Sequence, residues 1–311
     1  MMKVLVLGAS GGMGYSIVKE LLSRGIMVTA FARNREKLEK LFGNDENVTI
    51  FVGDVFRLDD LDKAAQGVDI IYQSANIPYI EWKERLPLLM SNILQTAEKH
   101  AAKLAVVDNV YAYGRSGGAL VSETTIKNPH TKKGNIRLQV ETLVKESSVS
   151  AFIAHFPDFY GPNAENTILH YTLVNVVKDK KSSYVGDQRI AREFIYTPDG
   201  AKAIVSLSLL NETYGQNWNI PGHSVISGEE MVKTIREITG YQKSVSTISK
   251  NMIRFLGMFN RQMREVVEMF YLNEEPVVLN GEKVEKLIGK VSNTSYEEGL
   301  KQTIVYMRHN Q

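Results

Sequence analysis

VLVLGASGGMGYSIVKELLSRG, Val4 to Gly25, lies near the start of the chain and carries its clearest structural signal. A short apolar run typical of a buried β-strand leads into glycines spaced G-x-x-G-x-x-G, and an amphipathic helix follows. Glycines allow a tight turn, a close approach of the backbone to a pyrophosphate and close packing of the helix on the strand, while the helix start offers free N–H groups to the phosphates. The stretch therefore predicts a dinucleotide-binding turn. Its predicted contacts are Gly8, Ser10, Gly11, Gly12, Met13 and Gly14.

The alternation of strand and helix continues through the first half of the chain. Short β-branched runs alternate with longer amphipathic stretches, as in a parallel sheet that is covered by helices on both faces. We predict an α/β fold, a Rossmann-type doubly wound parallel sheet with a smaller C-terminal α/β substrate lobe. Residues 1–157 would form the NADP-binding core, and residues 158–311 mainly the lobe, with some segments returning to the core. The predicted strands are Lys3–Leu7, Ile26–Phe31, Val48–Val52, Val68–Tyr72, Lys103–Asp108 and Ser150–Phe156.

Capping signals predict several helix ends. Ser227 with Glu230 three residues later forms a capping box for a helix that ends at Gly240, and Thr294 with Glu297 repeats the device. Left-handed cap residues are expected after three helices of the first half, at Gly25, Gly43 and Gly67.

A methionine-rich stretch, NMIRFLGMFNRQMREVVEMF, covers residues 251–270. Its apolar residues recur mostly at helical spacing, which favours an ordinary core helix. The alternative is a flexible apolar wall for a substrate pocket.

Composition excludes several classes of function. The 311 residues contain 43% hydrophobic residues, no cysteine and a net charge of +2 that is mixed along the chain. We therefore expect no nucleic-acid partner, no attraction to anionic lipid, no disulfide and no thiolate metal site. No cleavage signal follows the first residues and no apolar run approaches the ~20 residues of a membrane span, so we expect a soluble, cytoplasmic protein with no membrane partner. The oligomeric state stays open, with a homodimer as one alternative.

The segment after the second predicted strand indicates which cofactor is preferred. An NAD site usually has an acidic residue there for the ribose 2′-OH, whereas this chain has Arg33, which suits a 2′-phosphate. NADP is therefore favoured over NAD, and an exposed arginine at a helix start is the alternative. Further predicted contacts follow the second, third and fourth strands: Asn34, Asp54, Val55, Ser74, Ala75 and Asn76.

At this point the sequence resembles the extended and atypical short-chain dehydrogenase/reductases, the NAD(P)-dependent epimerase/dehydratase family. The matching stretches are LGASGGMG, GDV, SNILQTAEKH, VDNVYAYG, HFPDFYGPN, YVGD and EFIYTPDGAKAIV, which together extend to about residue 220. The resemblance implies a Rossmann core with a small C-terminal substrate lobe. It is specific for the superfamily and not for one reaction.

The resemblance also implies a Ser-Tyr-Lys triad, which this chain replaces at all three positions. Asn109 stands at the serine position, Lys133 at the tyrosine position and Arg137 at the lysine position. Asn109 could polarise a carbonyl and Arg137 could hold the nicotinamide ribose. Tyr111 and Tyr113 remain as candidate proton donors, with packing of the pocket wall as the alternative. Lys133 is either an acid with a lowered pKa or, as we favour, a solvated lysine at a helix start.

These observations leave more than one class of function open. The first is an NADP-dependent oxidoreductase or epimerase acting on a small carbonyl, hydroxyl or sugar-like substrate. The second is a non-catalytic NADP-binding sensor that resembles the nitrogen-metabolite-repressor-like proteins. A nucleotide-sugar epimerase or dehydratase is the third, and Arg189 and Arg192 are its only candidate partners for a diphosphate. The apolar C-terminal stretch favours a less polar substrate.

Overall fold

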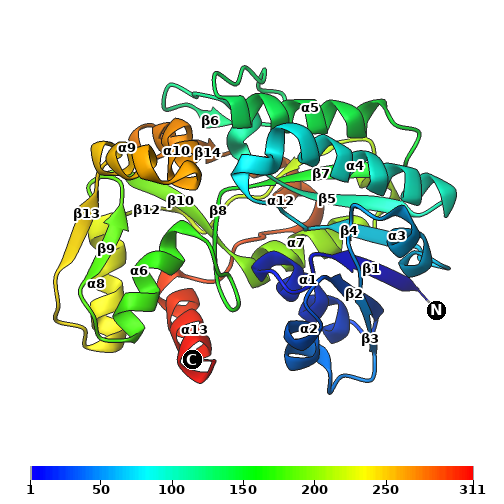
Figure 1. Cartoon of the computed structure of the whole chain (residues 1–311), viewed down its shortest axis with the longest axis horizontal. Helices are drawn as coiled ribbons and strands as arrows, with labels where there is room; N and C mark the ends of the chain where they lie inside the picture. The colour runs from blue at the N-terminus through cyan, green and yellow to red at the C-terminus, as the bar shows by residue number, and fades with distance from the viewer. Residues whose placement is uncertain (1, 311) are drawn as a thin grey trace.

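The computed structural model describes residues 2–310, and its centre is a sheet of seven parallel strands (Figure 1). The strand order, β11-β7-β5-β4-β1-β2-β3, is that of a doubly wound Rossmann sheet and confirms the predicted fold class. The edge strand β11 was not predicted, because its three residues, Asn-Trp-Asn, are too few and too polar to give a strand pattern. The strands are β1 (Lys3–Leu7), β2 (Met27–Ala32), β3 (Val48–Val52), β4 (Ile70–Gln73), β5 (Lys103–Asn109), β7 (Ala151–Phe156) and β11 (Asn217–Asn219).

Both faces of this sheet are buried. Along β1, Val4 and Val6 belong to one apolar cluster and Leu5 and Leu7 to the other, since alternate side chains of a strand point to opposite faces. A strand that is covered on both faces must be apolar throughout, which explains the continuous run that opens the chain. The first face is covered by α1 (Gly12–Ser23), α2 (Arg35–Phe42) and α7 (Thr197–Ser208), and the second by α3 (Leu58–Ala64), α4 (Trp82–Lys99) and α5 (Lys132–Glu146).

A second group of elements forms a smaller α/β lobe beside the carboxyl ends of the strands (Figure 1). Its core contains Tyr160, Leu173, Phe194, Met231 and Leu300. The strands are β8 (Asp158–Tyr160), β10 (Ala191–Tyr196) and β12 (Val225–Ser227) in one sheet, with β9 (Ser182–Val185) and β13 (Val245–Ile248) in another; the helices are α6 (Ile168–Val177), α8 (Gly228–Thr239) and α13 (Tyr296–His309).

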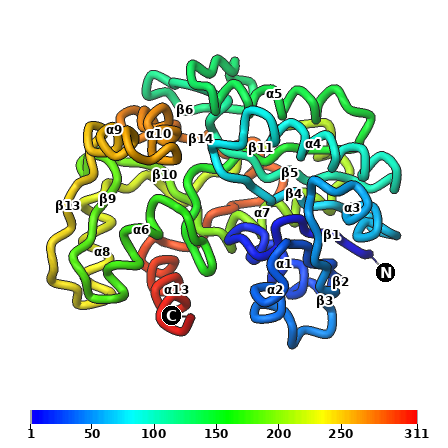
Figure 2. The backbone as a smooth tube through the Cα atoms, viewed as in Figure 1, coloured from blue at the N-terminus to red at the C-terminus, as the bar shows by residue number. Residues whose placement is uncertain are grey.

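Later segments of the chain also return to the core. Figure 2 shows the trace of α7 and β11 among the elements of the first half, where β11 pairs with β7 in parallel. A third small sheet joins β6 (Leu120–Val121) to β14 (Val278–Leu279). The remaining elements are η1 (Tyr79–Glu81), η2 (Val110–Tyr113), η3 (Asn211–Thr213), α9 (Lys250–Phe259), α10 (Arg261–Val267), η4 (Glu268–Phe270), α11 (Tyr271–Glu274) and α12 (Glu282–Ile288).

The helix caps agree with the sequence at most positions. Ser227 and Glu230 form the predicted capping box of α8, and Gly240 ends that helix with a φ of 71°. Gly25 and Gly67 also have left-handed φ values, of 70° and 67°. The other predicted left-handed cap is wrong: Gly43 has a φ of −61°, because its N–H still donates to Glu39 O in helical geometry.

The start of α13 lies one residue later than predicted. Ser295, not Thr294, is the N-cap, and its side chain accepts from Glu298 N–H. Thr294 instead donates from Oγ1 to the Asp199 carboxylate at 3.0 Å, so its hydroxyl links α13 to the start of α7. Ser and Thr are both favoured at the N-cap, Ser more so, and the tertiary contact of Thr294 leaves the cap to Ser295.

The methionine-rich stretch is not a core helix. It breaks at Asn260, whose side chain accepts from Gln262 and Met263 N–H and so caps α10 as a new helix. Within α9 only Ile253 and Gly257 are buried. Of the helices in residues 2–310, none is long and apolar enough to cross a membrane.

Candidate active site

The glycine-rich turn joins β1 to α1 and holds the two elements close together. Gly8 has a φ of 80°, and a Cβ added there would lie 2.6 Å from Ala75 Cα. A Cβ on Gly14 would lie 2.2 Å from Gly8 O. Real Cβ atoms do not tolerate such contacts with backbone, so the fold itself requires glycine at both positions.

Gly11 differs, because the fold does not need a glycine there. Its φ of −87° suits any residue, and the nearest atom to an added Cβ is Gly8 O, at an ordinary 3.4 Å. Gly11 is exposed and is the N-cap of α1, where no side chain caps the free N–H groups. An uncapped helix start beside an open glycine fits the pyrophosphate of a dinucleotide, which needs the backbone N–H groups and the space of the missing side chain.

A loop from the lobe contacts this turn. Asn163 Nδ2 donates to Ser10 O at 3.0 Å, and a Cβ on Gly12 would lie 2.6 Å from Ala164 Cα. These contacts were not predicted, because Asn163 and Ala164 lie some 150 positions away from the turn, and the stretch HFPDFYGPN, which ends at Asn163, gives no sign of a contact with it. Met13 lies at the same turn, but its side chain is buried in the core cluster under α7.

Arg33 follows β2 directly and is exposed. It forms no ion pair with any residue of the range 2–310, whereas Arg35 pairs with Glu39 and Lys37 with Glu165. Arg33 is thus a free cation at the carboxyl end of β2. Its neighbour Asn34 accepts from Lys37 N–H at 2.9 Å, so that side chain caps α2.

The other predicted cofactor contacts lie at the same edge of the sheet, after β3 and β4. Asp54 Oδ1 accepts from Phe56 N–H at 3.0 Å, which orders the turn after β3, while the side chain of Val55 is buried. After β4, Ser74 Oγ donates to Leu7 O at 2.7 Å. These contacts hold the turns in shape, and Asn76, two residues beyond Ser74, stays exposed.

Asn109 is the last residue of β5, and Tyr111 lies on η2, which follows directly; we call the segment 109–113 the lip. Asn109 Oδ1 accepts from Tyr111 N–H at 3.0 Å, and within residues 2–310 its side-chain NH2 group has no acceptor. The Tyr111 hydroxyl lies 2.6 Å from that of Tyr79 on η1. Burial and the neighbouring Tyr79 raise the pKa of Tyr111 well above 10, so this hydroxyl stays protonated. Tyr79 was not predicted, since it lies on a short 3-10 turn with no motif.

Tyr113 points to a different part of the molecule. Its hydroxyl donates to Asn219 Oδ1 on β11 at 2.8 Å, and its ring packs edge-on against His155 at 5.3 Å. It lines a separate cavity of about 220 Å³, together with Arg115, Val121 and other residues of the following loop. The structure therefore separates the two lip tyrosines, which the sequence left equivalent.

Arg137 is buried and held on two sides. Its Nη1 lies 3.1 Å from Asp108 Oδ1, and its guanidinium lies over the Trp82 ring at 4.3 Å. Asp108 directly precedes Asn109, so the ion pair fixes α5 to the end of β5. Arginine suits this place because its planar group can stack and pair at once.

Lys133 is buried, so the prediction of a solvated lysine at a helix start is wrong. The residue is 2% exposed, and its ammonium pairs with the carboxylates of Glu265 and Glu268, the latter at 3.2 Å. Glu268 also accepts from the backbone N–H groups of Lys132 and Lys133, so it binds the start of α5. The hairpin of α9 and α10 is thus fastened at the family's tyrosine position, across more than 130 residues of chain that gave no local signal.

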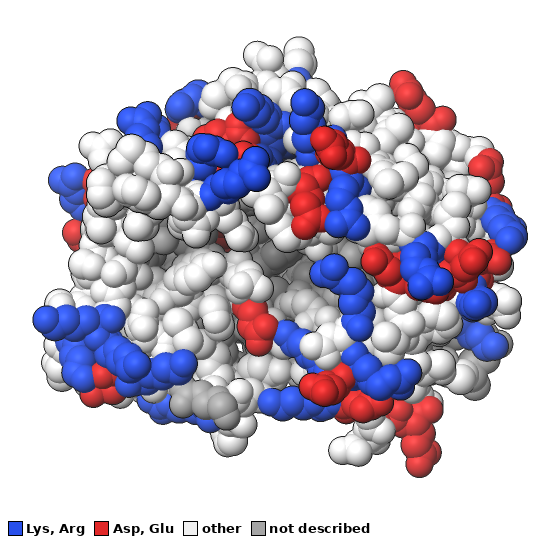
Figure 3. Space-filling view, in the orientation of Figure 1, with Lys and Arg blue, Asp and Glu red and all other residues white. Residues whose placement is uncertain are grey.

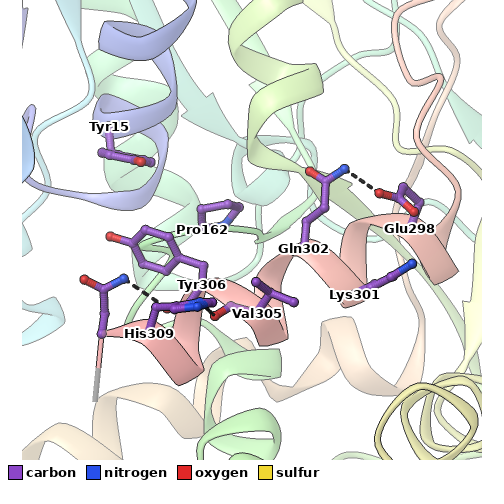
Figure 4. A pocket seen from close by; sticks show the side chains of 9 residues that line it. Tyr15, Pro162, Glu298, Lys301, Gln302, Val305, Tyr306 and His309 are labelled. Carbon is purple, nitrogen blue, oxygen red and sulfur yellow. Dashed lines mark hydrogen bonds between the residues drawn. The ribbon is translucent and has the colours of Figure 1, made fainter.

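The space-filling view shows a hollow between the core and the lobe (Figure 3). A separate shallow hollow of about 410 Å³ lies between α1 and α13, where Tyr15 faces Tyr306 at 5.8 Å between ring centres (Figure 4). None of the predicted site residues lines it. We therefore place the candidate site at the carboxyl edge of the sheet.

The comparisons with known proteins agree with this fold. Residues 8–178 match the NAD(P)H-binding family, and the chain belongs to that family. The solved UDP-glucuronic acid 4-epimerase from Bacillus cereus, in complex with NAD, superposes with a TM-score of 0.81 at 19% identity over 99% of both chains.

Two curated relatives extend the comparison. The photosystem II assembly factor Ycf39 of Synechocystis sp. is 19% identical over 84% of this chain and 74% of its own length. The 2-alkyl-3-oxoalkanoate reductase of Shewanella oneidensis is 34% identical, over 35% of this chain and 27% of its own length. The chain thus belongs to the NAD(P)H-binding family and has the fold of the solved epimerase.

Gly11→Val tests whether the turn holds a pyrophosphate. We expect NADPH binding to be lost, while the thermal unfolding and far-UV circular dichroism stay near those of the parent, because only the ligand needs that space. Gly14→Val is the matched control: its Cβ meets Gly8 O, so this variant should lose stability as well. Undiminished NADPH affinity in Gly11→Val would show that the triplet is only a turn.

Lys133→Met tests the ion pairs that fasten the hairpin. Breaking a fully buried pair costs about 3–5 kcal/mol. Glu265 and Glu268 are 32% and 24% exposed, and solvent reduces the expected loss of unfolding free energy to about 1–3 kcal/mol. Lys132→Met, at the exposed neighbouring position, is the control and should change little. Equal urea midpoints for both variants would contradict the assignment.

Proposed function

We propose that the protein is an NADP-dependent oxidoreductase that acts on the carbonyl or hydroxyl group of a small, predominantly apolar substrate. One observation carries the proposal: the open glycine turn after β1 and the lip of Asn109 and Tyr111 after β5 lie at the same edge of one parallel sheet. Ligands of doubly wound sheets bind at this edge.

The preference for NADP rests on Arg33. An exposed guanidinium without an acidic partner, directly after β2, is suited to the 2′-phosphate that distinguishes NADP from NAD. No acidic residue occurs between β2 and Glu36 to accept hydrogen bonds from a ribose 2′-OH. The NAD that is bound in the similar epimerase structure belongs to that protein and leaves the preference of this chain to be tested.

The lip supplies the groups for the chemistry. NADPH, when bound, supplies a hydride to the carbonyl carbon. The free NH2 group of Asn109 donates a hydrogen bond to the carbonyl oxygen and so stabilises its developing negative charge. Tyr111 gives that oxygen its hydroxyl proton and is reprotonated through the Tyr79 hydroxyl, 2.6 Å away. Arg137, which Asp108 holds in place, adds positive charge beside the tyrosine pair.

The ion pairs of Arg189 and Arg192 favour a substrate without a diphosphate. Arg192 is buried and pairs with Asp158 and Asn273, and Arg189 pairs with Asp187 at 2.6 Å. Both candidate cations for a nucleotide sugar are thereby neutralised by the protein's own side chains. The local similarity to a 2-alkyl-3-oxoalkanoate reductase supports a carbonyl substrate with an apolar body.

A non-catalytic NADP sensor is the second candidate function. The ion pairs of Lys133 favour it, because they occupy the position where this family usually has its acid. The two functions share the cofactor site and differ in whether a hydride from the cofactor and a proton from the Tyr111 hydroxyl are transferred to a substrate.

Cofactor preference can be measured by titrating NADPH and NADH against the intrinsic fluorescence. A charge-assisted hydrogen bond is worth about 1.5–3 kcal/mol, so NADPH should bind roughly tenfold or more tightly. Arg33→Asp should narrow or reverse this gap, whereas Lys40→Ala, at an exposed position in the last turn of α2, should leave it unchanged. Equal affinities for both cofactors in the parent protein would refute the assignment.

The two lip tyrosines give a matched pair of variants for the proposed chemistry. Tyr111→Phe should lower turnover by about 10²–10⁴ with NADPH affinity unchanged. Tyr113→Phe removes a hydroxyl that points to Asn219 and should leave turnover near that of the parent. A panel of aldehydes, ketones and 3-oxo acids with NADPH provides the assay.

The same assay has a predicted pH dependence. Because the pKa of Tyr111 is raised above 10, its proton is retained, and turnover should not fall as the pH is raised to about 10. Tight NADPH binding with no turnover across the panel would favour the sensor instead.

A further inference from the structure

We infer that the hairpin of α9 and α10 docks the protein on a membrane surface that carries anionic headgroups. Five large apolar side chains of α9 are exposed and form what we call the apolar tip. Two of them, Phe255 and Phe259, also contact each other, with ring centres 5.6 Å apart. The apolar tip consists of Met252 (50% exposed), Phe255 (60%), Leu256 (49%), Met258 (68%) and Phe259 (80%).

The helix explains why these side chains face solvent. Ile253 and Gly257, four residues apart, form the inward face of α9, and Gly257 lets it pack closely on α10, where an added Cβ would lie 3.0 Å from Arg264 Cα. The opposite face has no partner among residues 2–310. Exposure is greatest at Met258 and Phe259, where the chain turns into α10, so the tip protrudes and is not recessed.

The charged residues of the segment that contains the tip are all basic. Between residues 241 and 264 the chain contains five lysines and arginines and no acidic residue. Lys243 and Lys250 pair with Asp179 and Glu274. The other three cations, Arg254, Arg261 and Arg264, form no ion pair within residues 2–310. An apolar helix face flanked by free arginines is the pattern of helices that lie in the interface of anionic bilayers.

This local pattern departs from the expectation drawn from the whole chain, whose net charge of only +2 argued against lipid. Figure 3 shows an uncharged surface over α9, with basic side chains and some acidic ones at its margins. A second copy of the chain is a poorer occupant, because a two-fold contact through this face would bring like-charged arginines together. A protruding tip also suits an acyl layer better than a protein pocket.

Ion pairs also fix the hairpin to the core, which leaves its outer surface free to contact a membrane. Glu265 and Glu268 pair with the buried Lys133 of α5, which anchors the base of the hairpin to the core. The acidic residues of the hairpin are therefore turned inward, toward Lys133, and the free cations remain for the outer surface. The inference concerns this surface alone and does not depend on the proposed reaction.

Vesicle flotation of the full chain tests the inference. We expect the parent protein to float with vesicles of phosphatidylcholine containing 30% phosphatidylglycerol, and to be released at high salt. Phe255→Ser/Phe259→Ser and, separately, Arg254→Glu/Arg261→Glu should each reduce the bound fraction at least tenfold. Ile126→Ser is the control and should float like the parent, because Ile126 is an apolar residue outside the hairpin that is even more exposed, at 87%.

Sedimentation velocity and circular dichroism of the same variants distinguish a loss of membrane binding from a loss of folding or of a dimer. Loss of flotation with an unchanged fold and an unchanged sedimentation coefficient supports the inference. It is overturned if the parent does not bind anionic vesicles at low salt, if it binds vesicles of phosphatidylcholine alone equally well, or if the serine variant instead dissociates a dimer of the parent.

Discussion

The close contact between α1 and β1 is the constraint on which the rest of the structure depends. Gly14 lies so near the Gly8 carbonyl that it cannot carry a side chain, and Gly8 itself is closed off by the backbone of Ala75; the first contact sets the start of α1 directly above the end of the first strand. Because every strand of the sheet is parallel to β1, all the following turns emerge at the same edge. The cofactor turn, Arg33 and the lip at Asn109 are brought together by topology.

The first half of the fold could be predicted from the sequence because its strands are buried on both faces and its helices on one, and both patterns are local. Six strands of the central sheet were recognised within one or two residues of their ends. The edge strand β11 and the N-cap at Ser295 escaped prediction, because tertiary contacts select them. The methionine-rich stretch was misassigned for a related reason: helical spacing identifies an apolar face but does not say whether anything covers it.

The candidate site, too, has one part that the local sequence predicts and one part that depends on tertiary contacts. The glycine turn and Arg33 are read from a local motif, whereas the setting of the altered triad depends on residues far apart in the chain. Lys133 looks like a solvated lysine until Glu265 and Glu268 are placed beside it, and Tyr111 gains a hydroxyl partner only when η1 brings Tyr79 to the lip. The ion pairs of Lys133 bind the hairpin to the core beside the candidate site. One face of the hairpin therefore contacts the site, and the opposite face is exposed.

We propose that one edge of the sheet holds the dinucleotide, with its adenosine end at Arg33 and its nicotinamide at the lip. A crystal structure of the protein with NADPH tests this most directly. We expect the pyrophosphate over Gly11 at the start of α1, the 2′-phosphate beside Arg33, and the nicotinamide next to Asn109 and Tyr111. A dinucleotide bound elsewhere, or one with its nicotinamide turned away from Tyr111, would contradict it.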